Sequence, residues 1–188
     1  MSIFIKNNCV MVVLLLLSVE VVNAASSVDL TVSGTINEGT CTLSLNDSPI
    51  MLEAIDSSNT KLNEKVATKA KSFILNISQC SPGSAVHKPA LKFSGSTVNN
   101  QLWRNIDFND DNNAGKAYGI VLNETTNLLR CNNINEDAIL PGYCELGDEG
   151  DLLTDQNISF DVGYGKSSSP DINTGKVKSS INIAFEYH

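Results

Sequence analysis

Hydrophobic and polar positions alternate along most of this chain, which is the pattern of strands that bury one face. The clearest example is the stretch KVKSSINIAFEYH, residues 176–188. One parity of this stretch is apolar and is interrupted only by Ser179: Val177, Ile181, Ile183, Phe185 and Tyr187. The other parity is mostly polar. We therefore expect a terminal strand that buries one face and has no later segment of this sequence to cover its flank.

The same alternation predicts further short strands over the rest of the chain. They cover residues 28–36, 41–46, 49–55, 72–80, 90–95, 116–124, 128–129 and 157–164. The side chains expected to face the core are Phe73, Leu75, Ile77, Ile158, Phe160, Val162 and Tyr164. Polar loops are expected between the strands, above all over residues 96–115 and 132–151, and residues 57–71 are expected to form a helical turn or a long loop. Roughly seven to nine short strands with little helix indicate an all-β chain and favour an immunoglobulin-like β-sandwich.

The first 24 residues have the composition of a signal peptide. Lys6 precedes an apolar run over residues 10–19, and a small residue ends the VNA stretch at residues 22–24. We expect cleavage after Ala24 or after Ala25, and no membrane insertion, because the apolar run is too short for an anchor. Cleavage removes one basic and one acidic residue, so the net charge stays at −8. This charge argues against a nucleic-acid partner.

Four cysteines remain after cleavage: Cys41, Cys80, Cys131 and Cys144. An even number of cysteines in an exported chain indicates disulfides. Four cysteines can pair in three ways, and we favour the pairing of neighbours, Cys41 with Cys80 and Cys131 with Cys144. In the chain-entropy model such loops stabilise a fold by ~4 and ~3 kcal/mol. Zinc is the alternative, but the spacings do not fit, since there is no CxxC motif and no histidine beside the cysteines.

The sequence carries no catalytic or cofactor-binding motif that we can identify. Its two histidines, His87 and His188, have no metal-binding spacing, and no P-loop, GxGxxG or GxSxG occurs. The stretch DFNDDNNAG, residues 107–115, lacks the closing glutamate of an EF-hand and is interpreted as a solvated turn. Trp103 is interpreted as an anchor that packs its loop onto the core. We expect no enzyme activity, no metal and no cofactor.

The alternating segment at residues 28–36 stands ahead of Cys41 as an extra strand. It can pair within its own chain at the edge of a complete sandwich. It can also add to the sheet of another molecule, because a strand edge offers unpaired backbone groups to any extended segment. The two pairings predict different behaviour, a monomer in the first case and an assembly in the second.

Several motifs, taken in order, resemble the pilin subunits of bacterial chaperone–usher fimbriae. An N-terminal arm of alternating apolar residues has Gly34 seven residues before the first cysteine. TCTLSL opens the domain, FILNISQC ends on the second cysteine, and AGKAYGIVLNE follows in mid-chain. ISFDVGY and TGKVKSSINIAFEYH come last, with Tyr187 next to the end. The resemblance covers essentially the whole mature chain. The second cysteine pair and the Asn/Asp-rich stretch after Gly95 depart from it.

The resemblance implies an incomplete immunoglobulin-like sandwich that lacks its last strand and is completed by donor-strand complementation. In this family a periplasmic chaperone fills the gap first, and the arm of a neighbouring subunit fills it in the fibre, after delivery to an outer-membrane usher. The donor residues would be Val28, Leu30, Val32, Gly34 and Ile36. The acceptor groove and chaperone contact would involve Val177, Ile181, Ile183, Phe185, Tyr187 and His188.

These inferences divide the chain into a signal peptide (1–24), a donor-strand extension (25–39) and a pilin domain (40–188). We expect it to pass through the periplasm to the cell surface, as a structural subunit of a fimbria that contributes to cell adhesion. Its copies would form an open head-to-tail polymer. The alternative is a self-contained secreted β-sandwich that binds a sugar or a protein through its loops and stays monomeric.

Overall fold

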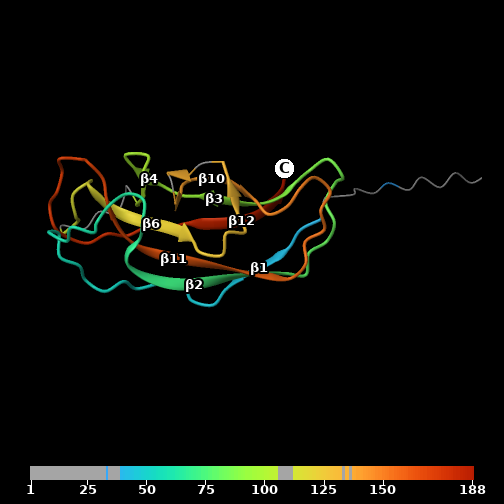
Figure 1. The fold of residues 1–188 in the computed structure, drawn as a ribbon, viewed down its shortest axis with the longest axis horizontal. Helices are drawn as coiled ribbons and strands as arrows, with labels where there is room; N and C mark the ends of the chain where they lie inside the picture. The colour runs from blue at the N-terminus through green and yellow to red at the C-terminus, as the bar shows by residue number, and fades with distance from the viewer. Residues whose placement is uncertain (1–32, 34–38, 106–111, 133, 136) are drawn as a thin grey trace, which may run out of the picture. The chain divides into compact units, whose positions relative to one another are not determined.

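The computed structural model describes residue 33 and residues 39–105, 112–132, 134–135 and 137–188. The strands of this part of the chain form two β-sheets (Figure 1). The first sheet has the strand order β1 (Thr42–Leu45), β2 (Thr68–Ser78), β11 (Gln156–Lys166), β6 (Tyr118–Glu124), β5 (Leu102–Trp103) and β4 (Thr97–Val98). Beside β6 it also holds β9 (Ala138–Ile139), which pairs with β8 (Ile134–Asn135). The second sheet has the order β12 (Asn182–Tyr187), β3 (Pro89–Ser94), β10 (Gly142–Glu145) and β7 (Arg130–Cys131). The described residues contain no helix, so the fold is all-β.

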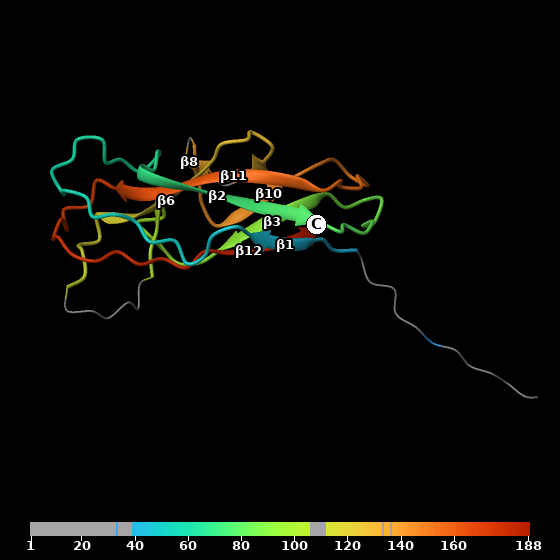
Figure 2. The ribbon, with the colours of Figure 1, turned by 90° about the horizontal axis from the view of Figure 1, so that it is seen from below.

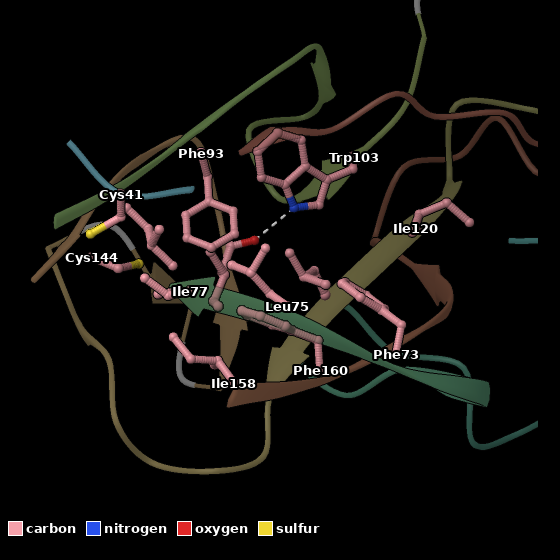
Figure 3. Packing of buried hydrophobic residues seen from close by; sticks show 13 residues of the cluster. Cys41, Phe73, Leu75, Ile77, Phe93, Trp103, Ile120, Cys144, Ile158 and Phe160 are labelled. Carbon is pink, nitrogen blue, oxygen red and sulfur yellow. Dashed lines mark hydrogen bonds between the residues drawn. The ribbon is translucent and has the colours of Figure 1, made fainter. Parts of the chain in front are cut away.

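The core lies between the two sheets and is built from the inward faces of their strands (Figure 3). Phe73, Leu75 and Ile77 of β2 are buried, and Ile74 between them is exposed. Phe160 of β11 stacks on Phe73, with ring centroids 5.2 Å apart. The same ring meets Phe93 of β3, in the other sheet, edge to face at 6.0 Å. Phe160 therefore joins the two sheets at the centre of the sandwich.

Trp103 confirms the prediction that it anchors its segment to the core. Its side chain is fully buried, and the indole Nε1 donates a hydrogen bond to the carbonyl oxygen of Ile139 at 2.7 Å (Figure 3). This bond satisfies the only polar group of the indole, as a buried tryptophan requires. The segment is not a plain loop, however, because Trp103 lies in β5 and pairs with Ile120 of β6.

The strands that carry the clearest alternation are confirmed, with shifted ends. The predicted strand at 72–80 begins earlier, at Thr68, where Lys69 adopts a left-handed φ of 51° beside a register shift in the pairing with β11. The terminal strand begins later, at Asn182. Val177 and Ile181 precede it and pack against the core from irregular backbone.

Several predicted elements are wrong. Residues 49–55 form no strand. Pro49 has no N–H to donate to a neighbouring strand. Just after β1, the side chain of Asn46 replaces its backbone carbonyl in the pairing with β2, because Asn46 Oδ1 accepts the hydrogen bond from the N–H of Ile74 at 2.6 Å. No strand forms at residues 128–129 either; β7 follows directly after them. The expected loops at 96–115 and 132–151 contain β4, β5, β8, β9 and β10. β10 pairs with β3, about 50 residues away, and β5 and β9 pair with β6, whereas β4 and β8 pair with the strands that follow them directly in the chain.

Both predicted disulfides are confirmed. Cys41 pairs with Cys80, 39 residues apart, and ties the start of β1 to the end of β2. Cys131 pairs with Cys144, 13 residues apart, and the two lie opposite each other on β7 and β10. The second bridge thus joins the antiparallel pair of β7 and β10, with β8 and β9 between them in the chain, and we call this pair the β7–β10 hairpin.

Candidate functional site

The terminal strand β12 lies at the end of the second sheet, and among the described strands it pairs only with β3. Ile183 and Phe185 face the core, because they lie opposite Phe93 and Leu91 of β3 in the register of the two strands. Phe93 and Leu91 are 1 % and 0 % exposed. Ile183 and Phe185 are only half-buried. The inward face of β12 is therefore less covered than that of the strand beside it.

The strand β1, at the end of the first sheet, also has core-facing side chains that are less buried than those of the strand beside it. Its strand partner within the described residues is β2, where Leu43 lies opposite Ile77 and Leu45 opposite Leu75. Leu75 and Ile77 are buried, whereas Leu43 is half-buried and Leu45 is 44 % exposed. Leu45 thus points toward the core side of its sheet, and the described residues cover its side chain only in part.

These two strand edges lie on the same side of the sandwich. Figures 1 and 2 both show β1 and β12 near each other at this side. Hydrogen bonds agree with the pictures: the hydroxyl of Tyr187 donates to the carbonyl oxygen of Ser81 at 2.9 Å, and the N–H of Ser81 donates to the carbonyl oxygen of Thr40 at 2.9 Å. We define the open edge as the free edges of β1 and β12 together with their four partly exposed, core-facing side chains: Leu43, Leu45, Ile183 and Phe185.

The segment at residues 49–55 follows β1 and has a strand-like pattern without strand pairing. Ile50 and Leu52 are half-buried against the core, and Met51 between them is 75 % exposed. Such alternation is typical of an extended segment that faces a core on one side. Ile50 and Leu52 therefore pack on the core from backbone that belongs to no strand.

The last two residues are held by the fold. The ring of Tyr187 lies over Gly83, where a Cβ atom would come within 2.4 Å of the ring, and it meets Phe185 edge to face at 5.0 Å. The backbone of His188 exchanges hydrogen bonds with Lys88, with N–O distances of 2.9 and 3.1 Å. The side chain of His188 stacks on Tyr143 of β10 with ring centroids 4.3 Å apart.

The structure brings together part of the predicted site. Four of the predicted acceptor residues lie on β12 or directly after it: Ile183, Phe185, Tyr187 and His188. Val177 and Ile181 lie before the strand and pack on the core. The predicted donor residues lie outside the described residues: Val28, Leu30, Val32, Gly34 and Ile36. The roles of both sets stay predictions, as does the division of the chain at residues 24 and 39.

Sequence reasoning missed two features of this region. Leu43 and Leu45 could have been found, because the alternation of TCTLSL places both on the face that the neighbouring strand buries. A polar cluster on the outer face of the second sheet could not, because its members come from three strands. Lys92 of β3 and Tyr143 of β10 converge there on Glu186 of β12.

This cluster has an electrostatic consequence for Glu186. The Tyr143 hydroxyl donates to Glu186 Oε2 at 3.0 Å, and Lys92 Nζ lies 3.2 Å from Glu186 Oε1. The hydrogen bond from Tyr143, followed by that from Lys92, lowers the pKa of the Glu186 carboxyl below its ordinary value of 4.5. A carboxyl whose pKa is lowered by folding stabilises the fold above its unfolded-state pKa and loses that contribution as the pH falls through the folded-state pKa.

The change Glu186→Gln is therefore expected to lower the melting temperature at neutral pH, because it removes the charge that Lys92 and Tyr143 bind. As the pH falls through the lowered pKa of Glu186, the unaltered carboxyl becomes protonated as well, and the melting temperatures of the two proteins are expected to converge. Thermal unfolding of both proteins from pH 7 down to pH 3 measures this. A difference in melting temperature that stays constant over the whole range would contradict the assignment.

The described part of the chain shows neither a metal centre nor a membrane helix. Among the residues that the structure describes, no three His, Cys, Asp or Glu side chains come together in a way that could hold a metal ion. The described segments also include no helix with the length and hydropathy needed to cross a bilayer. The site is distinguished by the free strand edges of β1 and β12 and by their partly exposed apolar side chains.

Comparisons with known proteins give a likeness in fold. No family model matches the sequence, and no curated protein does. One similar solved structure comes from a chaperone–usher pilus studied for the molecular basis of rod uncoiling, with 17 % identity, a TM-score of 0.47, and coverage of 87 % of this chain and 97 % of that one. Another is the P pilus rod subunit PapA, with 17 % identity, a TM-score of 0.44, and coverage of 85 % and 100 %.

Proposed function

We propose that this chain is a structural subunit of a bacterial surface pilus. Copies would polymerise head to tail, each donating residues 25–39, the arm, to the open edge of a neighbouring copy. The observation that carries the proposal is that both strand edges on one side of the sandwich leave core-facing side chains under-covered, Leu45 at 44 % exposure most of all. Soluble proteins usually cover or blunt such edges, because they invite pairing with another chain.

The arm has the residues that such an edge requires. Val28, Leu30, Val32 and Ile36 share one parity, so in an extended conformation their side chains point to one face. Residues 28–36 extended span about 30 Å, longer than the ~20 Å of the six-residue strand β12. Gly34, on the same parity, suits a place where the incoming backbone comes close to the acceptor.

The free energy of burying the apolar side chains of the arm supports stable strand addition. Fully burying one valine, leucine or isoleucine side chain contributes about 1.5–3 kcal/mol. Four such residues, with the backbone ladder along β12, offset the free energy lost in ordering the arm and immobilising a partner. An arm that enters a neighbouring copy gives a head-to-tail contact, which forms an open polymer when it does not close into a ring.

Before assembly the open edge needs a temporary occupant. We propose that a periplasmic chaperone adds a strand beside β12 and contacts Tyr187 and His188, and that an outer-membrane usher receives the complex. The chain would be exported through the periplasm under the direction of residues 1–24, and would reach the cell surface as part of a fimbria that serves adhesion. No catalysis is part of this role.

Substitutions in the arm test the proposal. Leu30→Asp with Val32→Asp is expected to weaken strand addition by about a hundredfold or more, because two charged groups replace buried apolar ones. The matched control is Thr31→Asp with Ser33→Asp, which adds the same charge to the polar parity and is expected to leave assembly nearly intact. Size-exclusion chromatography and electron microscopy of the mature chain measure multimers and filaments.

Two results would count against the proposal. If the unaltered chain stays monomeric and stable, the sandwich is complete by itself, as expected of a secreted binding module. If both arm variants assemble as well as the unaltered chain, the arm is not the strand that joins the copies.

A further inference from the structure

The hairpin of β7 and β10 lies on the side of β3 opposite to the terminal strand. Its two strands are joined by the disulfide between Cys131 and Cys144, which face each other in register. Cys144 is 1 % exposed and belongs to the core, as Figure 3 shows. Because neighbouring residues of a strand point to opposite faces, Tyr143 stands on the outer face of the sheet. The disulfide therefore fixes the base from which Tyr143 projects.

Tyr143 reaches across β3 to the terminal strand. Its hydroxyl donates to Oε2 of Glu186 at 3.0 Å, and its ring stacks on the imidazole of His188 with an interplanar angle of 16°. Lys92 of β3 lies between them, with Nζ 3.2 Å from Oε1 of Glu186 and 5.3 Å from the centroid of the Tyr143 ring. A hydrogen bond, an ion pair, a cation–π contact and a stacked ring pair thus connect three neighbouring strands.

A second connection runs from the same hairpin to the same end of the chain. Glu145 of β10 pairs with Lys88, with Nζ 3.1 Å from Oε1. The backbone of Lys88 in turn holds the backbone of His188 through two hydrogen bonds. Arg130 of β7 lies 4.0 Å from Oε2 of Glu145, so both strands of the hairpin contribute. The two routes meet at His188, beyond the end of β12.

We propose that the β7–β10 hairpin is a clamp that holds the terminal strand in register on β3, with Tyr143 as the positioning residue. A strand with one partner can fray, and a slip by one residue would turn its core-facing side chains outward. Holding Glu186 and His188 on the outer face keeps Ile183 and Phe185 directed inward. This inference rests on the proposed function, since the clamp prepares β12 to receive an added strand.

Hydrogen exchange in the unassembled full chain tests the clamp. Tyr143→Ala is expected to speed exchange of the β12 amides about fivefold to tenfold, because it removes the ring stack and the hydrogen bond that hold the strand. Tyr143→Phe keeps the stack and is expected to have a smaller effect. The matched control is Ser72→Ala, which removes a 2.6 Å hydrogen bond to Asp161 on the outer face of the first sheet and should leave β12 unchanged.

The same three variants are then mixed with a synthetic peptide covering residues 25–39. Tyr143→Ala is expected to release the peptide about fivefold to tenfold faster than the unaltered chain, Tyr143→Phe less so, and Ser72→Ala at the unaltered rate. Unchanged exchange of the β12 amides in Tyr143→Ala would overturn the clamp. Faster exchange with unchanged peptide release would also overturn it, because β12 would then not need positioning.

The exchange measurement requires no peptide, so the clamp and the proposed function can fail separately. If the unaltered chain binds no peptide, strand addition at the open edge is wrong, and with it the purpose assigned to the clamp. If the peptide binds and Tyr143→Ala behaves like the unaltered chain in both measurements, strand addition stands and the clamp is wrong.

Discussion

A peptide covering residues 25–39 is expected to raise the melting temperature of a domain shortened to residues 40–188 by about 10 °C. A ligand that binds only the folded state stabilises it by about 4 kcal/mol when its free concentration is a thousandfold above Kd. In a domain of this size, each kcal/mol shifts the melting temperature by about 2–4 °C. The rise should follow the logarithm of peptide concentration. Thermal unfolding with both disulfides formed, followed by circular dichroism, measures it.

The control for this experiment is a peptide with Leu30→Asp and Val32→Asp. It has the same length and the same backbone hydrogen-bonding groups, so a rise obtained only with the unaltered peptide would show that apolar side chains must enter the open edge. A domain that melts at the same temperature with either peptide would have a complete core. The pilus proposal would then give way to a self-contained binding module.

The second large effect is expected for Phe160→Ala. This side chain is fully buried and contacts Phe73 in its own sheet and Phe93 in the other. Truncating a buried phenylalanine costs about 3–5 kcal/mol, from lost transfer free energy and from the cavity that remains. The melting temperature should fall by about 10 °C. Denaturant unfolding of the variant and of the unaltered domain gives the free energy of unfolding directly.

Phe185→Ala is the matched control, since it removes the same ring from the open edge. Because Phe185 is only half-buried, its loss is expected to cost about 1–2 kcal/mol in the free domain. Its cost should rise when the peptide is bound, whereas the cost of Phe160→Ala should not change. Equal costs at the two positions in the free domain would mean that the edge is already covered.

Most of what forms the core could be predicted from local sequence. Phe73, Leu75 and Ile77 alternate strictly with polar or exposed neighbours, and burial of one face of a strand produces that pattern. The disulfide pairing was correct because both bridges join cysteines that follow each other along the chain. The alternation also predicts the terminal strand, although the strand begins only at Asn182.

What could not be predicted depends on contacts between distant segments. Residues 49–55 alternate like a strand, yet a strand needs a backbone partner, and the local pattern does not say whether one is present. The hairpin carrying Tyr143 lies in a polar stretch whose pairing with β3 joins residues about 50 apart. The contact of Tyr143 with Glu186 spans 43 residues and three strands. Periodicity carries no information on such neighbours.

The far edges of the two sheets bear on how a pilus of such subunits would grow. Within the described residues, the first sheet ends in β4 and, on its branch, in β8, and the second sheet ends in β7; all three strands are two residues long. Strands this short offer little backbone to a further chain, and the disulfide holds β7 against β10. Each subunit would then have a valence of two, one arm given and one arm received. Such a monomer can lengthen a fibre but cannot branch it.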